Sequence, residues 1–170
     1  MNTILTITGR TFDYNNPEGF NYSIEDIAHP LSNICRFGGH CRSFYSVAQH
    51  SVIIANLLPK ELRMEGLLHD ASEAFTVDIP KPLKVLLGDY NVLEKRILTA
   101  VLNHFGIFHE LSPEIKRVEN IVYEVEVRDL MNTTIPVTPK FSEFETIDPL
   151  PPKEAKELFL DTFYRIRDEK

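Results

Sequence analysis

The sequence predicts an all-α fold, mainly a helical bundle, with a short β-hairpin at its N-terminus. Long segments carry apolar residues at helical spacing or on nearly every side. Proline or glycine separates these segments, as expected where helices end. Alternation of apolar and polar residues, which is typical of strands, is limited to the beginning of the chain. There, Ile4 to Ile7 and Arg10 to Tyr14 flank Gly9 and form the predicted hairpin.

Local signals place the helices along the chain. Ser23 is followed three residues later by Asp26, an arrangement like a capping box at the start of a short helix. The run SVAQHSVIIANLL is apolar almost all round, as in a buried helix, and Pro59 ends it. Further helices are expected over ELRMEGLLHDASEAF, Asn91 to Phe105, Pro113 to Met131 and about residues 152–167.

The last part of the chain is predicted to contain a surface loop and then a terminal helix. The segment IPVTPKFSEFETIDPLPP is too rich in proline to be helical. The helix after it is expected to turn Leu158, Phe159, Phe163 and Ile166 inward. No repeat or convincing linker divides the 170 residues, so we predict a single domain over residues 1–170.

Composition and charge disfavour several classes of partner. Apolar residues make up 43% of the chain and charged residues 25%, as in ordinary globular proteins. The net charge of -7 disfavours binding to a polynucleotide or to an anionic membrane, but it allows a pocket for one small phosphorylated molecule. No signal peptide and no membrane-spanning apolar run are recognisable, so a cytoplasmic location is predicted.

The two cysteines, Cys35 and Cys41, are too few for a disulfide framework and are expected to be reduced. Together with His40 they suggest zinc ligands, but their spacing matches no closed zinc site and a fourth ligand is missing. Small, partly buried side chains are the better interpretation.

Three ionisable residues interrupt apolar helices. His50 lies in the buried run, and His69 and Asp70 are adjacent in the next helix. Each histidine taken alone is more typical of a hydrogen-bonded core residue than of a ligand. A buried carboxylate such as Asp70 nevertheless needs a cation or several donors, because its desolvation is costly.

The helix from Pro113 carries two carboxylates beside its apolar stripe. Glu119 and Glu126 lie seven residues apart on one flank, next to Val122, and are either solvated or turned partly inward. Two histidines with an aspartate and a glutamate would offer a metal ion both nitrogen and oxygen ligands. Such a set suits a divalent metal ion with open coordination positions, namely Co, Mn, Zn, Mg, Ni or Fe.

Three segments together resemble the HD-domain phosphohydrolase superfamily. They are SVAQHS, then LLHDASEAF with DIPKPLK, then IKRVENIVYEVEVRDL. The nearest groups are the 5'-deoxynucleotidases and the small phage enzymes that remove phosphate or triphosphate from deoxynucleotides such as dATP. The similarity covers Arg36 to Leu130, and the string H-D-A-S-E-x4-D-x-P-x-P-x-K is its most specific part. The resemblance implies an HD-type helical domain.

The resemblance implies a metal centre and a residue that activates water. Its metal ligands are His50, His69 and Asp70, with Glu119 as the fourth, at a position where the family usually has aspartate. Glu73 is the water-positioning residue in this interpretation. Its spacing of four from His69 independently places both on one face of the predicted helix.

The resemblance also implies residues that bind substrate. Asp78 is the second acidic group near the scissile bond, and Lys84 contacts the phosphates. Arg36, before FGGH, and Arg42 are the arginines expected to hold phosphate, since guanidinium groups bind its oxygens in a bidentate manner. Both arginines are alternatively helix-capping residues.

The function that follows is a metal-dependent phosphohydrolase acting on a small deoxynucleotide, as a dNMP 5'-nucleotidase or a dNTP triphosphohydrolase, in a homo-oligomer. The alternative is a regulatory nucleotide-binding protein that keeps the fold and hydrolyses nothing. Glu119 favours that alternative, whereas the presence of Glu73 and Asp78 argues against it.

Overall fold

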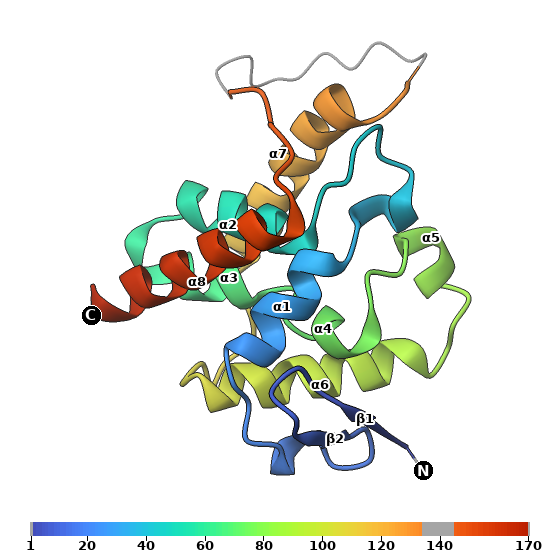
Figure 1. Ribbon diagram of the computed structural model, residues 1–170, viewed down its shortest axis with the longest axis vertical. Coiled ribbons are helices and arrows are strands. Elements are labelled where there is room, and N and C mark those ends of the chain that lie inside the picture. The colour runs from blue at the N-terminus through green and yellow to red at the C-terminus, as the bar shows by residue number, and fades with distance from the viewer. Residues whose placement is uncertain (1, 134–144, 170) are drawn as a thin grey trace.

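The computed structural model describes residues 2–133 and 145–169, and in this part the protein is mainly helical (Figure 1). The strands form one two-stranded antiparallel hairpin. The predicted fold class, all-α with a short N-terminal hairpin, is confirmed. The strands and α-helices are β1 (Thr3–Leu5), β2 (Thr11–Asp13), α1 (Glu25–Asn33), α2 (Val47–Leu57), α3 (Arg63–Leu68), α4 (Glu73–Thr76), α5 (Lys81–Lys84), α6 (Tyr90–His104), α7 (Pro113–Leu130) and α8 (Pro152–Asp168). Short 3-10 helices cover Pro17–Gly19, Arg36–Gly39 and Lys60–Leu62.

The hairpin lies against the helices through one buried aromatic side chain. Ile4 of β1 pairs with Phe12 of β2, and Gly9 takes a positive φ of 78° in the turn between the strands. Phe12 is fully buried and stacks on Phe75 of α4, with ring centroids 4.2 Å apart. This aromatic contact anchors the hairpin to the helical core.

The start of α1 differs from the predicted capping box. The Ser23 hydroxyl accepts a hydrogen bond from the Glu25 N–H at 3.3 Å, as a cap would. The Asp26 carboxylate instead turns to the hairpin, where it accepts hydrogen bonds from the Thr8 hydroxyl at 2.9 Å and the Arg10 guanidinium at 2.6 Å. A buried carboxylate gains more from a guanidinium and a hydroxyl than from one backbone N–H, which explains the difference.

Helix α2 runs through the centre of the bundle and contacts α1, α3, α7 and α8. Its N-cap is Ser46, whose hydroxyl accepts from the Gln49 N–H. Gly66 allows α3 to approach α2 closely, because a Cβ there would lie 2.3 Å from Leu58 Cδ1 and 3.3 Å from Ala55 Cα. The close packing places Gly66 of α3 against the C-terminal half of α2.

The single helix predicted over ELRMEGLLHDASEAF is wrong, because the structure breaks it. Helix α3 ends at Leu68, residues 69–72 form a turn, and α4 begins at Glu73. In the turn, the Ala71 N–H donates to Leu68 O and the Glu73 N–H donates to Asp70 O, both at 3.0 Å. Each of these hydrogen bonds runs to the residue three positions earlier, which is the pattern of a turn and not of an α-helix. His69 and Glu73 therefore do not share the face of one continuous helix.

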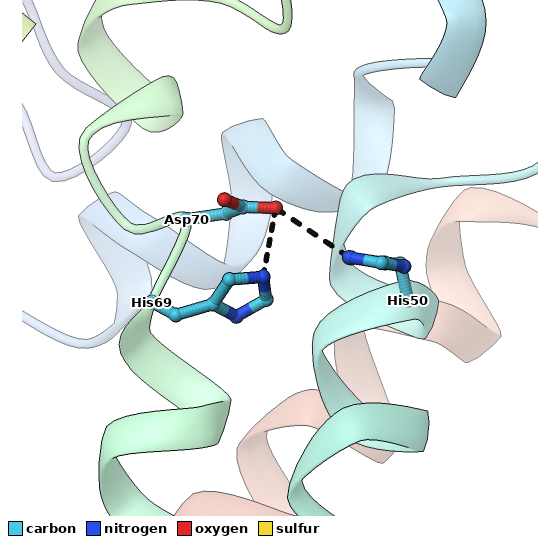
Figure 2. Close-up of side chains that lie close together, drawn as sticks. All are labelled: His50, His69 and Asp70. Carbon is cyan, nitrogen blue, oxygen red and sulfur yellow. Dashed lines mark ion pairs between the residues drawn. The ribbon is translucent and has the colours of Figure 1, made fainter. Parts of the chain in front are cut away.

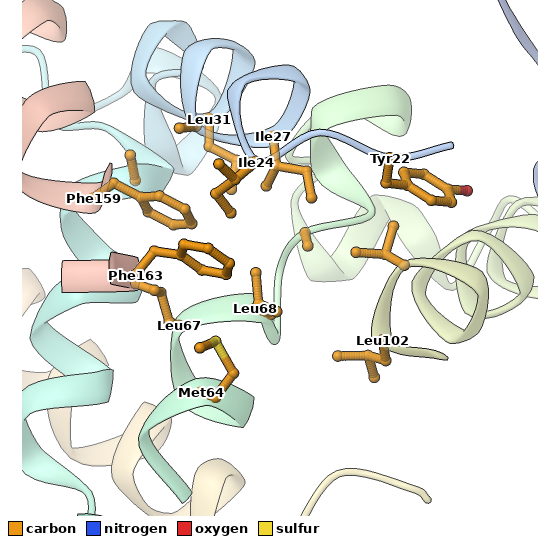
Figure 3. Packing of buried hydrophobic residues seen from close by; sticks show 14 of the residues in the cluster. Tyr22, Ile24, Ile27, Leu31, Met64, Leu67, Leu68, Leu102, Phe159 and Phe163 are labelled. Carbon is orange, nitrogen blue, oxygen red and sulfur yellow. The ribbon is translucent and has the colours of Figure 1, made fainter. Parts of the chain in front are cut away.

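Helix α8 closes the core against α1, α2 and α3 (Figure 3). Phe159, Phe163 and Ile166 are buried as predicted, at the i, i+4 and i+7 spacing of one helix face. Leu158 was also predicted to point inward, but it is 38% exposed. It lies about 100° around the helix from Phe159, and therefore at the edge of the buried face.

The predicted surface loop lies largely beyond this description, because residues 134–144 are outside the described residues. Residues 145–151, its last part, have no regular secondary structure and lead into α8. Among the described helices, none combines the length and the apolar character needed to span a bilayer.

Candidate metal centre

Three of the predicted metal ligands meet inside the bundle (Figure 2). His50 projects from the first turn of α2, and His69 and Asp70 come from the turn after α3. One potential ligand atom from each lies within 4.8 Å of the others. Asp70 Oδ2 is 3.1 Å from His69 Nε2 and 3.7 Å from His50 Nε2. This spacing allows all three side chains to coordinate one ion.

Hydrogen bonds at the far side of each ring fix the two histidine tautomers. His50 Nδ1 lies 2.6 Å from Glu126 Oε1, and His69 Nδ1 lies 2.8 Å from Gly66 O. Because a carbonyl and an ionised carboxylate only accept, each Nδ1 carries the hydrogen. Each Nε2 is then turned toward Asp70, and both Nε2 atoms are buried without a hydrogen-bond partner. Such orphaned nitrogens suit a metal ion.

The charges at the centre also suit a cation. Burial raises the pKa of Asp70, but His69, His50 and Arg36 outweigh it, so its pKa lies below the ordinary value and the carboxylate is ionised. Burial together with Arg36 lowers the pKa of His50, which keeps that imidazole neutral. For His69, burial is outweighed by Asp70, which raises the pKa and so favours positive charge at this position. A divalent ion beside Asp70 would supply that positive charge, and His69 would bind it as the neutral imidazole.

A buried carboxylate that the sequence left unassigned orients His50. Glu126 of α7 is fully buried and accepts hydrogen bonds from His50 Nδ1 at 2.6 Å, Tyr45 Oη at 2.9 Å and Arg36 Nη2 at 3.0 Å. Burial raises its pKa, but His50 and Arg36 lower it to about 2. Its position on the flank of the apolar stripe indicated a partly inward side chain, but not which residues it contacts.

Glu119, the predicted fourth ligand, lies outside the group of three. Both of its carboxylate oxygens are 2.7 Å from Lys116 Nζ, and its side chain is 32% exposed. Glu119 nevertheless lines the same pocket as His69, and its charge raises the pKa of that histidine. Coordination by Glu119 would require its carboxylate to leave Lys116.

A pocket of about 890 Å³ opens beside the three ligands. Charged residues from several elements line it: Arg36, Asp70, Glu73, Asp78, Lys81, Lys84, Lys116 and Glu119. Its apolar lining includes Phe37, Ile79, Pro80 and Tyr123. The pocket therefore combines many charged groups with several apolar and aromatic ones.

Glu73 and Asp78, the predicted catalytic residues, both face this pocket. Glu73 is buried, and its Oε2 has no hydrogen-bond partner. Burial, Asp70 and Asp78 raise the pKa of Glu73 well above its ordinary value. Burial also raises the pKa of Asp78. A carboxylate with a raised pKa is a better proton acceptor near neutral pH.

Arg36 connects the pocket to the buried network. Its Nη2 lies 3.0 Å from Glu126 Oε2, and its Nη1 lies 3.8 Å from Asp70 Oδ2. The guanidinium also lies over the Phe37 ring, 5.2 Å from its centroid. Phe37 and Gly38 have positive φ values of 58° and 60°, a strained backbone for phenylalanine that brings its ring to the pocket.

Arg42 and the two cysteines do not belong to this site. The Arg42 backbone N–H donates to Leu130 O at 2.8 Å, and its guanidinium donates to Asp129 O. Arg42 therefore caps the end of α7, the alternative that the sequence left open for it, and it is not among the pocket-lining residues. Within the described residues, the group suited to a metal contains neither Cys35 nor Cys41.

The fold and the site define a mainly helical protein with a buried His-His-Asp cluster beside a charged pocket. No protein-family model matches the chain. It is 39% identical over 172 residues to the uncharacterized protein YfdR of Escherichia coli, with 96% of this chain and 94% of YfdR covered. It is also 33% identical over 132 residues to the uncharacterized protein RCAP_rcc00048 of Rhodobacter capsulatus, covering 72% of this chain and 67% of that protein. The chain belongs to the same family as YfdR.

Proposed function

We propose that the protein is an HD-type phosphohydrolase that uses a divalent metal ion to remove phosphate or triphosphate from a small deoxynucleotide. The observation that carries the proposal is that the two buried histidine Nε2 atoms have no hydrogen-bond partner and face the Asp70 carboxylate. His50, His69 and Asp70 would hold the ion. When bound there, it supplies Lewis acidity toward a phosphoryl oxygen and a water molecule.

The remaining site residues account for the other requirements of phosphoester hydrolysis. Arg36 presents positive charge to the phosphoryl oxygens, where charge builds up in the transition state, and Lys84 binds a phosphate oxygen of the substrate. Water attacks phosphorus while the ester bond to the leaving oxygen breaks, and Glu73 Oε2 takes the proton of the water. Asp78 delivers a proton to the leaving oxygen, a role for which its raised pKa suits it.

The pocket supports a nucleotide more than a polymer as substrate. Charged and apolar residues both line the cavity, so it offers groups that bind phosphate and groups that pack on a ring. The net charge of -7 leaves little attraction for a long polyanion.

A second function, nucleotide binding without hydrolysis, is favoured by one observation. Glu119 is engaged with Lys116 and lies outside the cluster of ligands, so the cluster has three protein ligands in place of four. A weakly held ion would support nucleotide binding without efficient turnover.

The test is a substrate panel on protein with measured metal content. Purified protein is assayed with dNMPs and dNTPs in the presence of Mn²⁺, Co²⁺ or Mg²⁺, and phosphate and triphosphate are quantified separately. We expect metal-dependent release of one of these products. Nucleotide binding without turnover under every metal would favour the regulatory alternative, and absence of both binding and turnover would reject both functions.

Three variants make this test specific. His69→Gln is expected to lose metal and activity together, because glutamine lacks the ring nitrogen at the ion. Glu73→Gln is expected to retain metal and lose turnover, because the amide takes no proton. Glu110→Gln serves as the matched control, since Glu110 forms an exposed pair with Lys95 away from the pocket. Full activity in Glu73→Gln would contradict the proposed mechanism.

A further inference from the structure

Lys84 has a carboxylate partner that the sequence motif does not contain. Its ammonium lies 2.6 Å from Glu94 Oε1 and 3.5 Å from Glu73 Oε1. All three side chains are mostly buried, and Lys84 and Glu73 line the pocket. Lys84 therefore stands between the proposed catalytic carboxylate and a second carboxylate behind it.

The element that carries Lys84 has few buried contacts of its own. Helix α5 has only four residues and contains no buried one. Leu83, Val85 and Leu86 beside Lys84 are 46%, 77% and 78% exposed. Packing alone therefore does little to define the position of Lys84, whose flexible side chain would otherwise sample many rotamers.

Helix α6, in contrast, offers a well-anchored support. It has 15 residues, and Ile97, Ala100 and Val101 on it are buried in the core. Glu94 lies on this helix, one turn before the buried face begins. Asn91, also on α6, donates from Nδ2 to the Lys84 carbonyl at 3.2 Å. Both the backbone and the side chain of Lys84 are thus attached to α6.

Tyr90 holds Glu94 in turn. The Tyr90 hydroxyl lies 3.1 Å from Glu94 Oε1, 3.1 Å from Val77 O and 3.2 Å from Thr76 O. Its one hydrogen can be donated to one of these acceptors at a time. The Tyr90 ring also lies under the Lys84 ammonium, 5.7 Å from it. Tyr90 and Glu94 together form a cradle for the ammonium group.

We propose that Glu94 is a positioning residue that holds the Lys84 ammonium at the pocket wall, where it binds a phosphate oxygen of the substrate. An ammonium group has three donors. Glu94 accepts a hydrogen bond from one of them at 2.6 Å, and Glu73 forms an ion pair with the ammonium at 3.5 Å, so at least one donor is left for an anion in the pocket. The inference deepens the proposed function and rests on it, because the anion is the substrate phosphate.

The first test measures the position of Lys84 without any substrate. Burial lowers the pKa of Lys84, but Glu94 and Glu73 outweigh it and raise the pKa above the ordinary value, so the amine reacts slowly with acylating reagents. Limiting acetic anhydride followed by peptide mass spectrometry gives the labelling rate of each lysine. In Glu94→Gln we expect Lys84 to react about threefold faster or more, the change that half a pKa unit alone would produce.

The internal reference in the same digests is Lys95, which is 74% exposed and pairs with Glu110. Its labelling rate is expected to be equal in wild type and Glu94→Gln. Glu94→Asp, which keeps the charge, is expected to leave Lys84 closer to the wild-type rate than Glu94→Gln does. Equal labelling of Lys84 in wild type and Glu94→Gln would overturn the inference.

The second test uses the nucleotide that the panel identifies. We expect Glu94→Gln to raise KM about fivefold or more and to change kcat by less than about twofold, because Lys84 binds phosphate alike in the ground state and the transition state. Lys84→Met should have the same signature. The double variant should be no worse than Lys84→Met alone, since Glu94 acts through Lys84.

The outcomes separate this inference from the proposed function. Additive effects of Glu94→Gln and Lys84→Met, or an unchanged KM in Glu94→Gln, would overturn the role of Glu94. So would a loss of activity that merely follows a loss of thermal stability, which would indicate a structural ion pair. If wild-type protein hydrolyses no nucleotide, the proposed function fails. Faster labelling of Lys84 in Glu94→Gln would then still support its positioning, and equal labelling would reject it.

Discussion

Replacing Glu126 by glutamine removes one negative charge from the most buried part of the site while keeping the side-chain shape. The carboxylate accepts hydrogen bonds from His50, Tyr45 and Arg36. Glutamine has one carbonyl oxygen and one amide nitrogen. When the oxygen faces His50 and Tyr45, the nitrogen faces Arg36 Nη2, so one donor loses its acceptor.

Two independent considerations give the size of the effect. The pKa of Glu126 is lowered from 4.5 to about 2, and a shift of this size corresponds to about 3 kcal/mol of stability at neutral pH. Removing one partner of a buried ion pair typically costs about 3–5 kcal/mol. We therefore expect Glu126→Gln to lower the free energy of unfolding by about 3 kcal/mol, measured by urea denaturation at pH 7.

The pH dependence of the difference provides a second measurement. Because the pKa of Glu126 is depressed in the folded protein, its contribution is fully present above pH 4.5 and is lost as the pH falls toward about 2. Glutamine does not titrate. The difference in stability between wild type and Glu126→Gln should therefore be constant from pH 7 to about pH 5 and shrink at lower pH.

The control is Glu119→Gln on the same helix. Glu119 forms a partly exposed pair with Lys116, so its replacement should change the free energy of unfolding by less than about 1 kcal/mol. Metal affinity, measured by calorimetry, should fall about 10- to 100-fold in Glu126→Gln because His50 loses its orienting partner. A loss of stability under about 1 kcal/mol together with unchanged metal affinity would refute this account.

Two further predictions concern the ion and the packing of the bundle. Mn²⁺ at about 100 times its Kd should raise the free energy of unfolding of wild type by about 2.7 kcal/mol. It should have no such effect on His69→Gln. Equal stabilisation of both proteins would show that the ion binds elsewhere. Gly66→Ala should lower the free energy of unfolding by about 1–3 kcal/mol in urea denaturation, because the new Cβ would lie 2.3 Å from the buried Leu58. Gly88→Ala, where nothing lies within 4 Å, should stay within about 0.5 kcal/mol of wild type, and a similar loss in both variants would argue against the clash.

Much of the fold and part of the site could be predicted from local patterns. The hairpin, the buried helix with His50, and the inward Phe159, Phe163 and Ile166 all follow from the periodicity of apolar residues, because each pattern is encoded within a few turns of the chain. His50, His69 and Asp70 were recognisable as unusual for the same reason, since ionisable groups in apolar helices need a partner.

Other features depended on contacts between distant segments. The break after Leu68 sets His69 and Asp70 in a turn, whereas the apolar pattern continues without interruption through it. Leu158 lies at the edge of its helix face because the neighbouring helices determine how wide the buried stripe is.

The choice between Glu119 and Glu126 illustrates the limit most clearly. Both lie on the same flank of α7, and spacing along one helix treats them alike. Only the packing of α7 on α2 brings Glu126 to His50 and leaves Glu119 at the pocket with Lys116. The sequence by itself determined the helices and the presence of buried ionisable groups, because those depend on neighbours along the chain. The tertiary structure decided which of these groups meet, because the distance between two helices is set by the side chains that pack between them.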